Sequence, residues 1–212
     1  MKNAYRTYFS LILPWIVLAL VMNLTRILFV KEYGYLYMNW NLFLALVPVF
    51  LVYLYEKEHV PFLRFLTFIL WFLFFPNAVY LVTDFIHLRA SGPDWMLWYD
   101  GMMLFLYASV GVLSSSFSFM RMKENIFHSF HRMNRGVFLF IVALLSSFGI
   151  YLGRYIRMNS WDIVFHPIST IQQAMNTVGD KYAHPVFLMT IVFFTMFIIV
   201  MEISFEKIFK AK

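Results

Sequence analysis

Six long apolar runs constrain the fold of this chain more than any other feature of its sequence. A helix needs about 20 mainly apolar residues to cross a bilayer, and each run is close to or above that length. Because unpaired backbone groups are not tolerated in lipid, such continuous runs fold as helices. The sequence therefore predicts an all-α fold, a six-span transmembrane bundle that forms one domain over residues 1–212. The runs are roughly Phe9–Val30, Leu36–Tyr55, Phe62–Val82, Met96–Met120, Gly136–Arg154 and Pro185–Phe205.

The composition supports a membrane protein and excludes several kinds of chemistry. Hydrophobic residues make up 62% of the chain, compared with about 45–50% in soluble domains. The chain has no cysteine, which excludes disulfides, thiolate catalysis and cysteine-based metal sites. A net charge of +6 would suggest nucleic-acid binding in a soluble protein. Here the basic residues flank apolar runs, where they set topology and contact the lipid bilayer, so no nucleic-acid partner is expected.

The distribution of Lys and Arg predicts which way the bundle faces. With six spans, the termini and the second and fourth loops share one side of the membrane, and most of the 17 basic residues fall there. Such basic segments stay in the cytoplasm, so both termini are expected there, in a cell (plasma) membrane. No small-residue cleavage site follows the first run, which is expected to remain as a span. The basic residues on the terminal side are Lys2, Arg6, Lys57, Arg64, Arg121, Lys123, Arg132, Arg135, Lys207, Lys210 and Lys212.

Two connecting segments carry patterns of their own. Residues 121–135 are basic and amphipathic, and they are expected to form a cytoplasmic loop that contacts the inner leaflet. After Pro167, apolar residues recur at helical spacing as far as Val178, which predicts a short interfacial helix on the outer surface after span five.

A narrow polar stripe near the end of the third run is the main candidate for a site. Asn77, Tyr80, Asp84 and His87 recur at i, i+3, i+7 and i+10, so on an α-helix they fall within an arc of roughly 80°. Pro76 lies within the run and is expected to kink the helix by freeing a backbone carbonyl. Asn77 then has two possible roles. It either forms hydrogen bonds with the freed backbone groups, which is a structural role, or contacts a ligand.

Asp84 and His87 are the first catalytic candidates. Ionisable residues near membrane depth usually face the bundle interior, form pairs or serve a pathway. An Asp and a His at i, i+3 can act as general base and orienting group, or can share a metal. The alternative is a solvated helix end.

Asp100, near the start of the fourth run, is the third catalytic candidate. It is either a carboxylate in the first helical turn, favoured by the helix dipole, or the partner of Asp84 in a carboxylate pair, since the two helix ends share a face. Any metal would use Asp84, His87 and Asp100. The sequence leaves both the metal and the cofactor unknown.

The end of the fifth run adds two basic residues where few are expected. Gly149 and Gly153 form a small-xxx-small pair that permits close helix approach. Arg154 and Arg157 follow at the expected outer end, against the positive-inside trend, so a partner is expected for each. They either pair with Asp84, Asp100 or Asp162, or hold a phosphate or carboxylate in bidentate geometry. The full set of substrate-binding candidates is Tyr80, Arg89, Trp98, Tyr99, Tyr151, Arg154, Arg157, Asn159, Trp161 and Asp162.

Three of these segments together resemble a known family. PNAVYLVTDFIHL (Pro76–Leu88), WYD (Trp98–Asp100) and GIYLGRYIRMNSWD (Gly149–Asp162) are similar to the bacterial membrane-protein family called domain of unknown function 1361. The resemblance covers spans three to five well, and the rest mainly through hydropathy. It implies an integral membrane protein in which these segments matter, and it implies no particular reaction.

Two functions from different classes fit these patterns. The first is a membrane-embedded enzyme that binds or processes an anionic lipid headgroup or a lipid-linked substrate at the outer leaflet, with Asp84, His87 and the arginines in the roles above. The second is a non-enzymatic membrane partner, accessory subunit or small transporter, in which the same polar residues form an internal ion-pair network. The sequence shows no internal repeat, which favours the partner over the transporter.

Overall fold

The computed structural model describes residues 2–31, 33–88, 94–129, 134–157 and 184–210, together with the single positions 168, 169, 172, 175 and 176. Within these residues all regular secondary structure is helical, and six helices are long and apolar enough to cross a membrane. The six-span helical prediction is therefore confirmed. The elements are α1 (Lys2–Val30), α2 (Tyr37–Lys57), α3 (Pro61–Tyr80), η1 (Leu81–His87), α4 (Asp94–Ser129), α5 (Arg135–Tyr151), η2 (Leu152–Ile156) and α8 (His184–Lys210).

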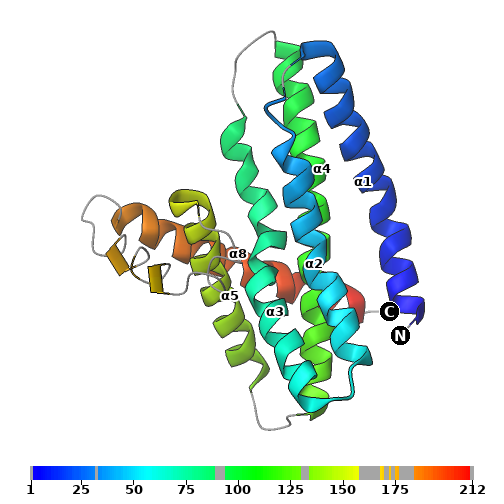
Figure 1. Ribbon diagram of the computed structural model, residues 1–212, viewed down its shortest axis with the longest axis vertical. Coiled ribbons are helices and arrows are strands. Elements are labelled where there is room, and N and C mark those ends of the chain that lie inside the picture. The colour runs from blue at the N-terminus through cyan, green and yellow to red at the C-terminus, as the bar shows by residue number, and fades with distance from the viewer. Residues whose placement is uncertain are drawn as a thin grey trace.

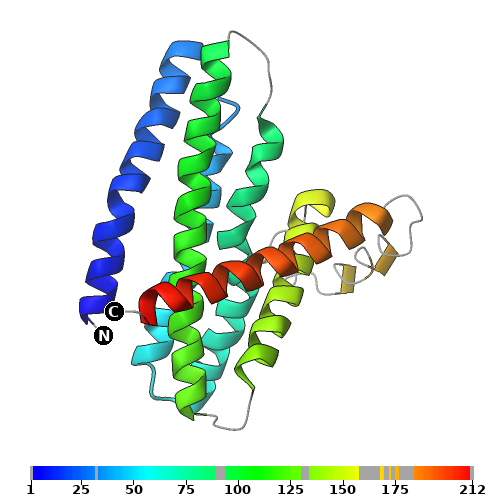
Figure 2. The ribbon, with the colours of Figure 1, turned by 180° about the vertical axis from the view of Figure 1, so that it is seen from behind.

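The helices α1 to α4 form an elongated bundle, and α5 lies beside α3 (Figure 1). Helix α8 crosses the bundle obliquely and packs against α5 and α4 (Figure 2). The end of the bundle that carries η1, the end of α1 and the start of α4 is called the η1 end below. Most of the polar contacts described in the next section lie at that end.

Local sequence explains where several helices begin. Pro61 is the first residue of α3, a position where its missing N–H costs no hydrogen bond. The side chain of Asn134 accepts hydrogen bonds from the backbone N–H groups of Gly136 and Val137, so it caps the start of α5.

Helix α4 is longer than its apolar run predicts, which corrects the expected loop at residues 121–135. The helix continues to Ser129 because its basic residues find acidic partners on other helices. Arg121 Nη2 lies 2.6 Å from Oε1 of the buried Glu56 on α2, and Lys123 Nζ lies 2.5 Å from Oε2 of Glu206 on α8. A count of apolar residues misses such an extension because ion pairs, rather than lipid contact, hold it.

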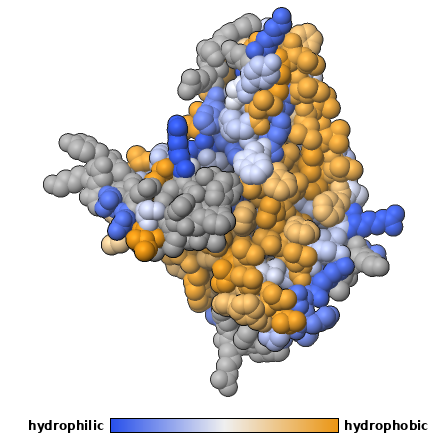
Figure 3. Space-filling view, viewed as in Figure 1, coloured by the Kyte–Doolittle hydropathy of each residue, from blue (hydrophilic) through white to orange (hydrophobic). Residues whose placement is uncertain are grey.

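Apolar residues cover much of the surface, as expected of a bundle that faces lipid. Figure 3 shows apolar residues over much of the described face, with hydrophilic residues in its upper part, at the η1 end, and others at its lower right. Large side chains that would be buried in a soluble protein are exposed on several helices. Examples with more than half of their surface exposed are Phe29, Phe43, Phe62, Phe65, Met189 and Phe193.

Two glycines set the distance between α3 and its neighbours. A Cβ on Gly111 of α4 would lie 2.3 Å from the carbonyl oxygen of Ala78, so only glycine fits there. A Cβ on Gly149 of α5 would lie 3.0 Å from Cγ of Pro76, which agrees with the close helix approach expected of Gly149. Asn77 donates a hydrogen bond to the carbonyl of Phe74 at 3.1 Å, in line with its structural interpretation.

The predicted interfacial helix after Pro167 falls mostly outside the described residues. Among those described there, positions 168, 169, 172, 175 and 176 are helical, and both Ile168 and Met175 are exposed.

Candidate functional site

The polar stripe continues beyond α3 on a tighter helix than expected. After Tyr80 the chain forms the 3₁₀ segment η1, so the α-helical spacing assumed for the stripe does not hold over residues 81–87. A 3₁₀ helix has three residues per turn, which places residues i and i+3 directly above one another. Asp84 and His87 therefore share one face of η1 more closely than an α-helix would allow.

Arg154 reaches this face from η2 and contacts four residues between Tyr80 and His87. Its Nη2 donates to Oδ1 of Asp84 at 2.6 Å and to the Thr83 hydroxyl, to which Nε also donates at 2.9 Å. Its Nη1 lies 2.8 Å from Nε2 of His87, and its guanidinium lies 4.5 Å from the centre of the Tyr80 ring. The side chains of Arg154 and Asp84 are 10% and 1% exposed, so the pair is buried.

Helix α2 closes the cluster from the other side. Asn41 Nδ2 donates to Oδ2 of Asp84 at 3.2 Å. The Tyr37 ring meets the His87 ring edge-on, with centroids 5.3 Å apart. The Tyr37 hydroxyl is buried and has no hydrogen-bond partner within the described part of the chain. The set Tyr37, Asn41, Tyr80, Thr83, Asp84, His87 and Arg154 is called the Arg154 cluster below.

A second buried ion pair lies at the same end, between α1 and α4. Arg26 Nε lies 2.7 Å from Oδ1 of Asp100 and its Nη2 lies 3.1 Å from Oδ2, which is a bidentate pair. The guanidinium also lies 4.3 Å from the centre of the Tyr35 ring. The Tyr35 hydroxyl donates to the backbone carbonyl of His87 at 3.0 Å. Tyr35 therefore connects the two ion pairs.

A neutral polar network supports the second pair. Asn23 of α1 is fully buried and donates to the Tyr35 carbonyl and to the Tyr107 hydroxyl, both at 3.0 Å. The Tyr107 hydroxyl in turn donates to Oδ1 of Asn39 at 2.5 Å. These contacts join α1, α2 and α4 around the end of the loop between α1 and α2.

Comparison with known families finds one match. Residues 40–201 match the family described as a protein of unknown function, DUF1361. The chain belongs to this family. No curated protein and no solved structure matches the chain.

The family match includes the whole Arg154 cluster except Tyr37, and it excludes Arg26. It confirms the resemblance drawn from the three sequence segments. It adds no reaction, so the chemistry of the site follows from its geometry alone.

The structure brings four of the predicted site residues together, and these are Tyr80, Asp84, His87 and Arg154. Sequence reasoning missed Asn41, Thr83, Tyr37 and Arg26. The signal that could have found Asn41 and Arg26 is the one used for Asp84, a polar residue within an apolar run.

Other predicted site residues lie elsewhere. Tyr99 donates to the carbonyl of Met22 on α1, and Trp98 is exposed. Tyr151 is buried against Tyr155 and against Phe187 of α8. Gly153 lies within η2, whose end is set by the exposed Arg157 with its left-handed φ of 60°. Four candidates, Arg89, Asn159, Trp161 and Asp162, lie outside the described residues.

Asp100 has a different environment from either of the two expected. Helix α4 begins at Asp94, so Asp100 lies beyond the first turn, where the dipole effect has faded. Its carboxylate is paired with Arg26 rather than with Asp84. Each of the two carboxylates is therefore paired with its own arginine.

The hydrogen bonds of the Arg154 cluster define which atoms accept and which donate. A guanidinium only donates, so Nε2 of His87 accepts from Arg154 and the ring proton lies on Nδ1. Both oxygens of Asp84 are occupied, one by Arg154 and the other by Asn41. The acceptors on Thr83, Asp84 and His87 are therefore engaged, while the Tyr37 hydroxyl remains as a buried donor.

The described residues contain no group of three or more His, Asp or Glu side chains close enough to hold a metal ion. In this arrangement Asp84 and Asp100 each face a guanidinium, which supplies the positive charge that a metal would otherwise supply.

Proposed function

We propose that this membrane protein binds an anionic headgroup, that of a lipid or a lipid-linked substrate, at the Arg154 cluster. The observation that carries the proposal is that two donors meet at the His87 ring. The Tyr37 ring contacts it, with a hydroxyl that is buried and without a partner within the described residues, and Arg154 contacts its Nε2.

The donors of the cluster outnumber its open acceptors. Nη1 of Arg154 carries two hydrogens, and His87 Nε2 accepts one of them. The Tyr37 hydroxyl adds a further donor, and the acceptors on Asp84 are already used. A phosphate or carboxylate oxygen is the group that such a set of donors binds best. An arginine suits this role because its planar fork contacts two oxygens at once.

The proposal includes a location for the site. The excess of Lys and Arg on the side of the termini supports a plasma-membrane orientation with both termini in the cytoplasm. The η1 end would then face outward, so the headgroup would come from the outer leaflet. Exposed tryptophans at the start of α4, Trp95 and Trp98, suit the interface at that end.

Asp84 could take a catalytic role only after the headgroup has bound. In the described state each oxygen of Asp84 already accepts a hydrogen bond, one from Arg154 and the other from Asn41, which makes this carboxylate a weaker base towards a substrate. An anionic headgroup that takes the N–H groups of Arg154 would release Oδ1 of Asp84 beside the bound ligand. The enzyme hypothesis therefore requires exchange of partners at Arg154, with Asp84 as general base and His87 as the group that orients it.

The binding step is tested by replacing Arg154 with Lys, which keeps the charge and removes the fork. Purified protein is titrated with phosphatidylglycerol and with phosphatidylcholine, and bound lipid is counted by native mass spectrometry. We expect the wild type to prefer the anionic lipid, and Arg154→Lys to lose about tenfold in affinity, as expected when one charge-assisted bond is lost. Arg135→Lys, at the other end of α5, is the matched control and should bind as the wild type does.

Equal binding of both lipids by the wild type, or wild-type affinity in Arg154→Lys, would rule out the headgroup proposal. The enzyme hypothesis has its own test with a lipid-linked substrate. Asp84→Ala and Arg154→Ala should each abolish turnover in protein that remains folded, and wild-type turnover in both would exclude it.

One observation favours a second candidate, a non-enzymatic partner or accessory subunit. Arg26 and Arg154 are each paired with a carboxylate of the same chain, as in an internal ion-pair network. This alternative predicts purification in a stable complex with another membrane protein, together with no preference for anionic lipid.

A further inference from the structure

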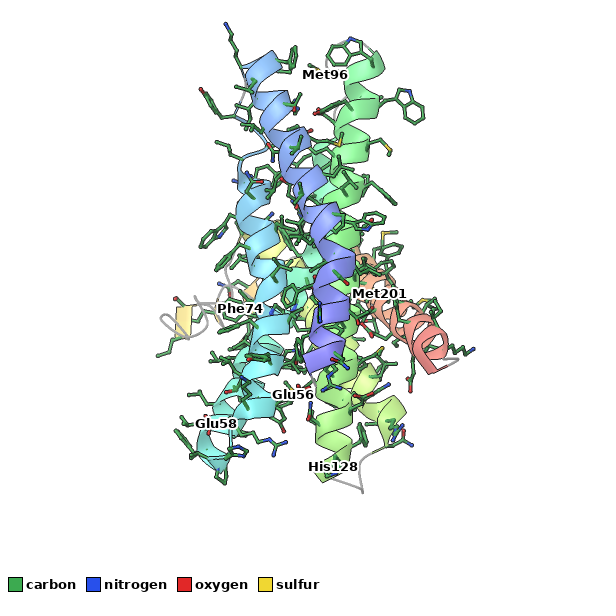
Figure 4. All side chains as sticks on the ribbon, turned by 90° about the vertical axis from the view of Figure 1, so that its right-hand side faces the viewer. Glu56, Glu58, Phe74, Met96, His128 and Met201 are labelled. Carbon is green, nitrogen blue, oxygen red and sulfur yellow. The ribbon has the colours of Figure 1, made fainter. Side chains whose placement is uncertain are left out.

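Glu202 of α8 is an acidic residue inside the bundle, far along the chain from the Arg154 cluster. It is 2% exposed, and neither of its carboxyl oxygens has a hydrogen-bond partner within the described residues. Its neighbour Met201 lies where α8 crosses α4, 3.9 Å from the hydroxyl of Ser115 (Figure 4). Glu202 therefore lies at the contact between two helices that are both apolar enough to span the membrane.

The lysine that faces Glu202 already has an acidic partner. Lys123 of α4 is the cation that faces Glu202, and its Nζ lies 2.5 Å from Oε2 of Glu206. Glu206 lies one turn further along α8, and its side chain is 26% exposed. A carboxylate without a paired cation is costly in the interior of a membrane protein. Glu202 therefore meets the condition under which a carboxyl group is held in its neutral, proton-bearing form.

A hydroxyl on α4 completes the surroundings. Ser116 is the hydroxyl that faces Glu202, and its oxygen is also buried without a hydrogen-bond partner among the described residues. A serine hydroxyl can donate to a carboxylate or accept from a carboxylic acid, so it suits both forms of the side chain. The elements packed against α8 are α4 and α5. The charged groups that face Glu202 from these elements and from α8 itself are Lys123 and Glu206.

We propose that Glu202 and Ser116 form a proton-binding site inside the membrane, which exchanges its proton with water through Glu206 and Lys123. The four side chains run from the buried α4–α8 contact towards the partly exposed end of α8. Glu202 and Glu206 are at i, i+4 and share one face of that helix. Lys123 pairs with Glu206 at the entrance, while Glu202 carries the proton at the buried end. This site is independent of the headgroup site, because the Arg154 cluster shares no residue with it.

Dicyclohexylcarbodiimide, an apolar reagent that adds to protonated carboxyl groups, tests the proposal on the intact purified protein. Peptide mass spectrometry should find the adduct on Glu202, with labelling that declines as the pH is raised. The exposed Glu124 is the internal control, and it should react with a water-soluble carbodiimide but not with the apolar one. Sodium at fixed pH should leave the labelling unchanged.

Infrared difference spectroscopy gives a second measurement that does not depend on the reagent. The wild type should show the C=O band of a buried carboxylic acid, which shifts in D₂O because its proton exchanges. Glu202→Gln should lack that band and unfold at the wild-type temperature, since glutamine resembles the neutral acid. Glu206→Gln should retain the band and exchange more slowly.

Three outcomes would overturn the proposal. The first is no adduct on Glu202 in folded protein, and the second is a carboxylic-acid band that persists in Glu202→Gln. The third is protection of Glu202 by sodium, which would make the ligand a metal cation instead of a proton.

Discussion

The η1 end holds two buried arginine–carboxylate pairs that differ in how their bonds are distributed. Arg26 gives two of its nitrogens to one carboxylate, that of Asp100. Arg154 divides its nitrogens among Thr83, Asp84 and His87. A bidentate pair engages both oxygens of the carboxylate with a single arginine. An arginine whose bonds are divided can release one acceptor while it keeps the others. We therefore expect the Arg26 pair to serve stability and the Arg154 pair to serve the proposed binding.

Breaking the bidentate pair of Arg26 and Asp100 should have the largest effect on stability. Asp100→Ala leaves the guanidinium of Arg26 buried without its carboxylate, and we expect a loss of about 3–5 kcal/mol of stability. Thermal unfolding in detergent, followed by tryptophan fluorescence, measures the loss. The double variant Arg26→Met with Asp100→Leu removes both charges and should recover most of it. If that variant is as unstable as the single one, the pair does more than neutralise its own charges.

Moving α5 away from α3 should disturb the contacts of Arg154 and leave those of Arg26 unchanged. Gly149→Ala places a Cβ 3.0 Å from Cγ of Pro76, so α5 must shift, at roughly 1–3 kcal/mol. Arg154, carried by η2 at the end of α5, should then bind anionic lipid less tightly. Gly101→Ala is the control because its added Cβ would meet no atom nearer than 4.0 Å. Unchanged lipid binding in Gly149→Ala would show that the contact with Pro76 does not position the cluster.

Removing the link between the pairs should have a moderate effect on both. Tyr35→Phe loses the hydrogen bond to the His87 carbonyl but keeps the ring beside Arg26. We expect a loss of about 1 kcal/mol. Combined with Asp100→Ala in a double-mutant cycle, the two losses should not add, since Tyr35 contacts the partner of Asp100. Simple additivity would indicate that the pairs act separately.

The smallest effect on stability should come from Tyr37, whose hydroxyl has no hydrogen-bond partner within the described residues. Tyr37→Phe removes a buried hydroxyl that contributes no hydrogen bond in the described structure, so stability should change by less than about 0.5 kcal/mol. Affinity for phosphatidylglycerol should fall nonetheless, as measured by native mass spectrometry. Tyr33→Phe, at an exposed position between α1 and α2, is the control. A stability loss without any loss of affinity would place Tyr37 in the core rather than in the site.

The helices could be predicted from the sequence because the membrane imposes a length and a composition on each span. The ends of the helices were less predictable, because they depend on side-chain contacts with residues distant in the sequence. Helix α4 continues past Met120 because Arg121 and Lys123 find Glu56 and Glu206, and no local pattern shows such pairing. The 3₁₀ segment η1 was missed because α-helical spacing was assumed throughout the stripe.

Only part of the site could be predicted, because polar residues in apolar runs can be recognised from the sequence but their pairing cannot. Asp84, His87 and Arg154 were selected because each is polar where lipid is expected, and the fold brings them together. Asn41 and Arg26 satisfy the same rule, but each lies in a run with other polar residues, and the rule does not tell which of these form contacts. Which carboxylate pairs with which arginine depends on helix packing, which one sequence does not reveal.

The bond between Arg26 and Asp100 also bears on the order in which the chain is made. The two residues are 74 positions apart, so Arg26 enters the membrane region long before its partner is synthesised. At ordinary translation rates the interval is about 4–15 s. During that time the charge on Arg26 must be met by water, by lipid headgroups or by the insertion machinery. The final position of α1 is therefore fixed late in biogenesis, when the start of α4 arrives.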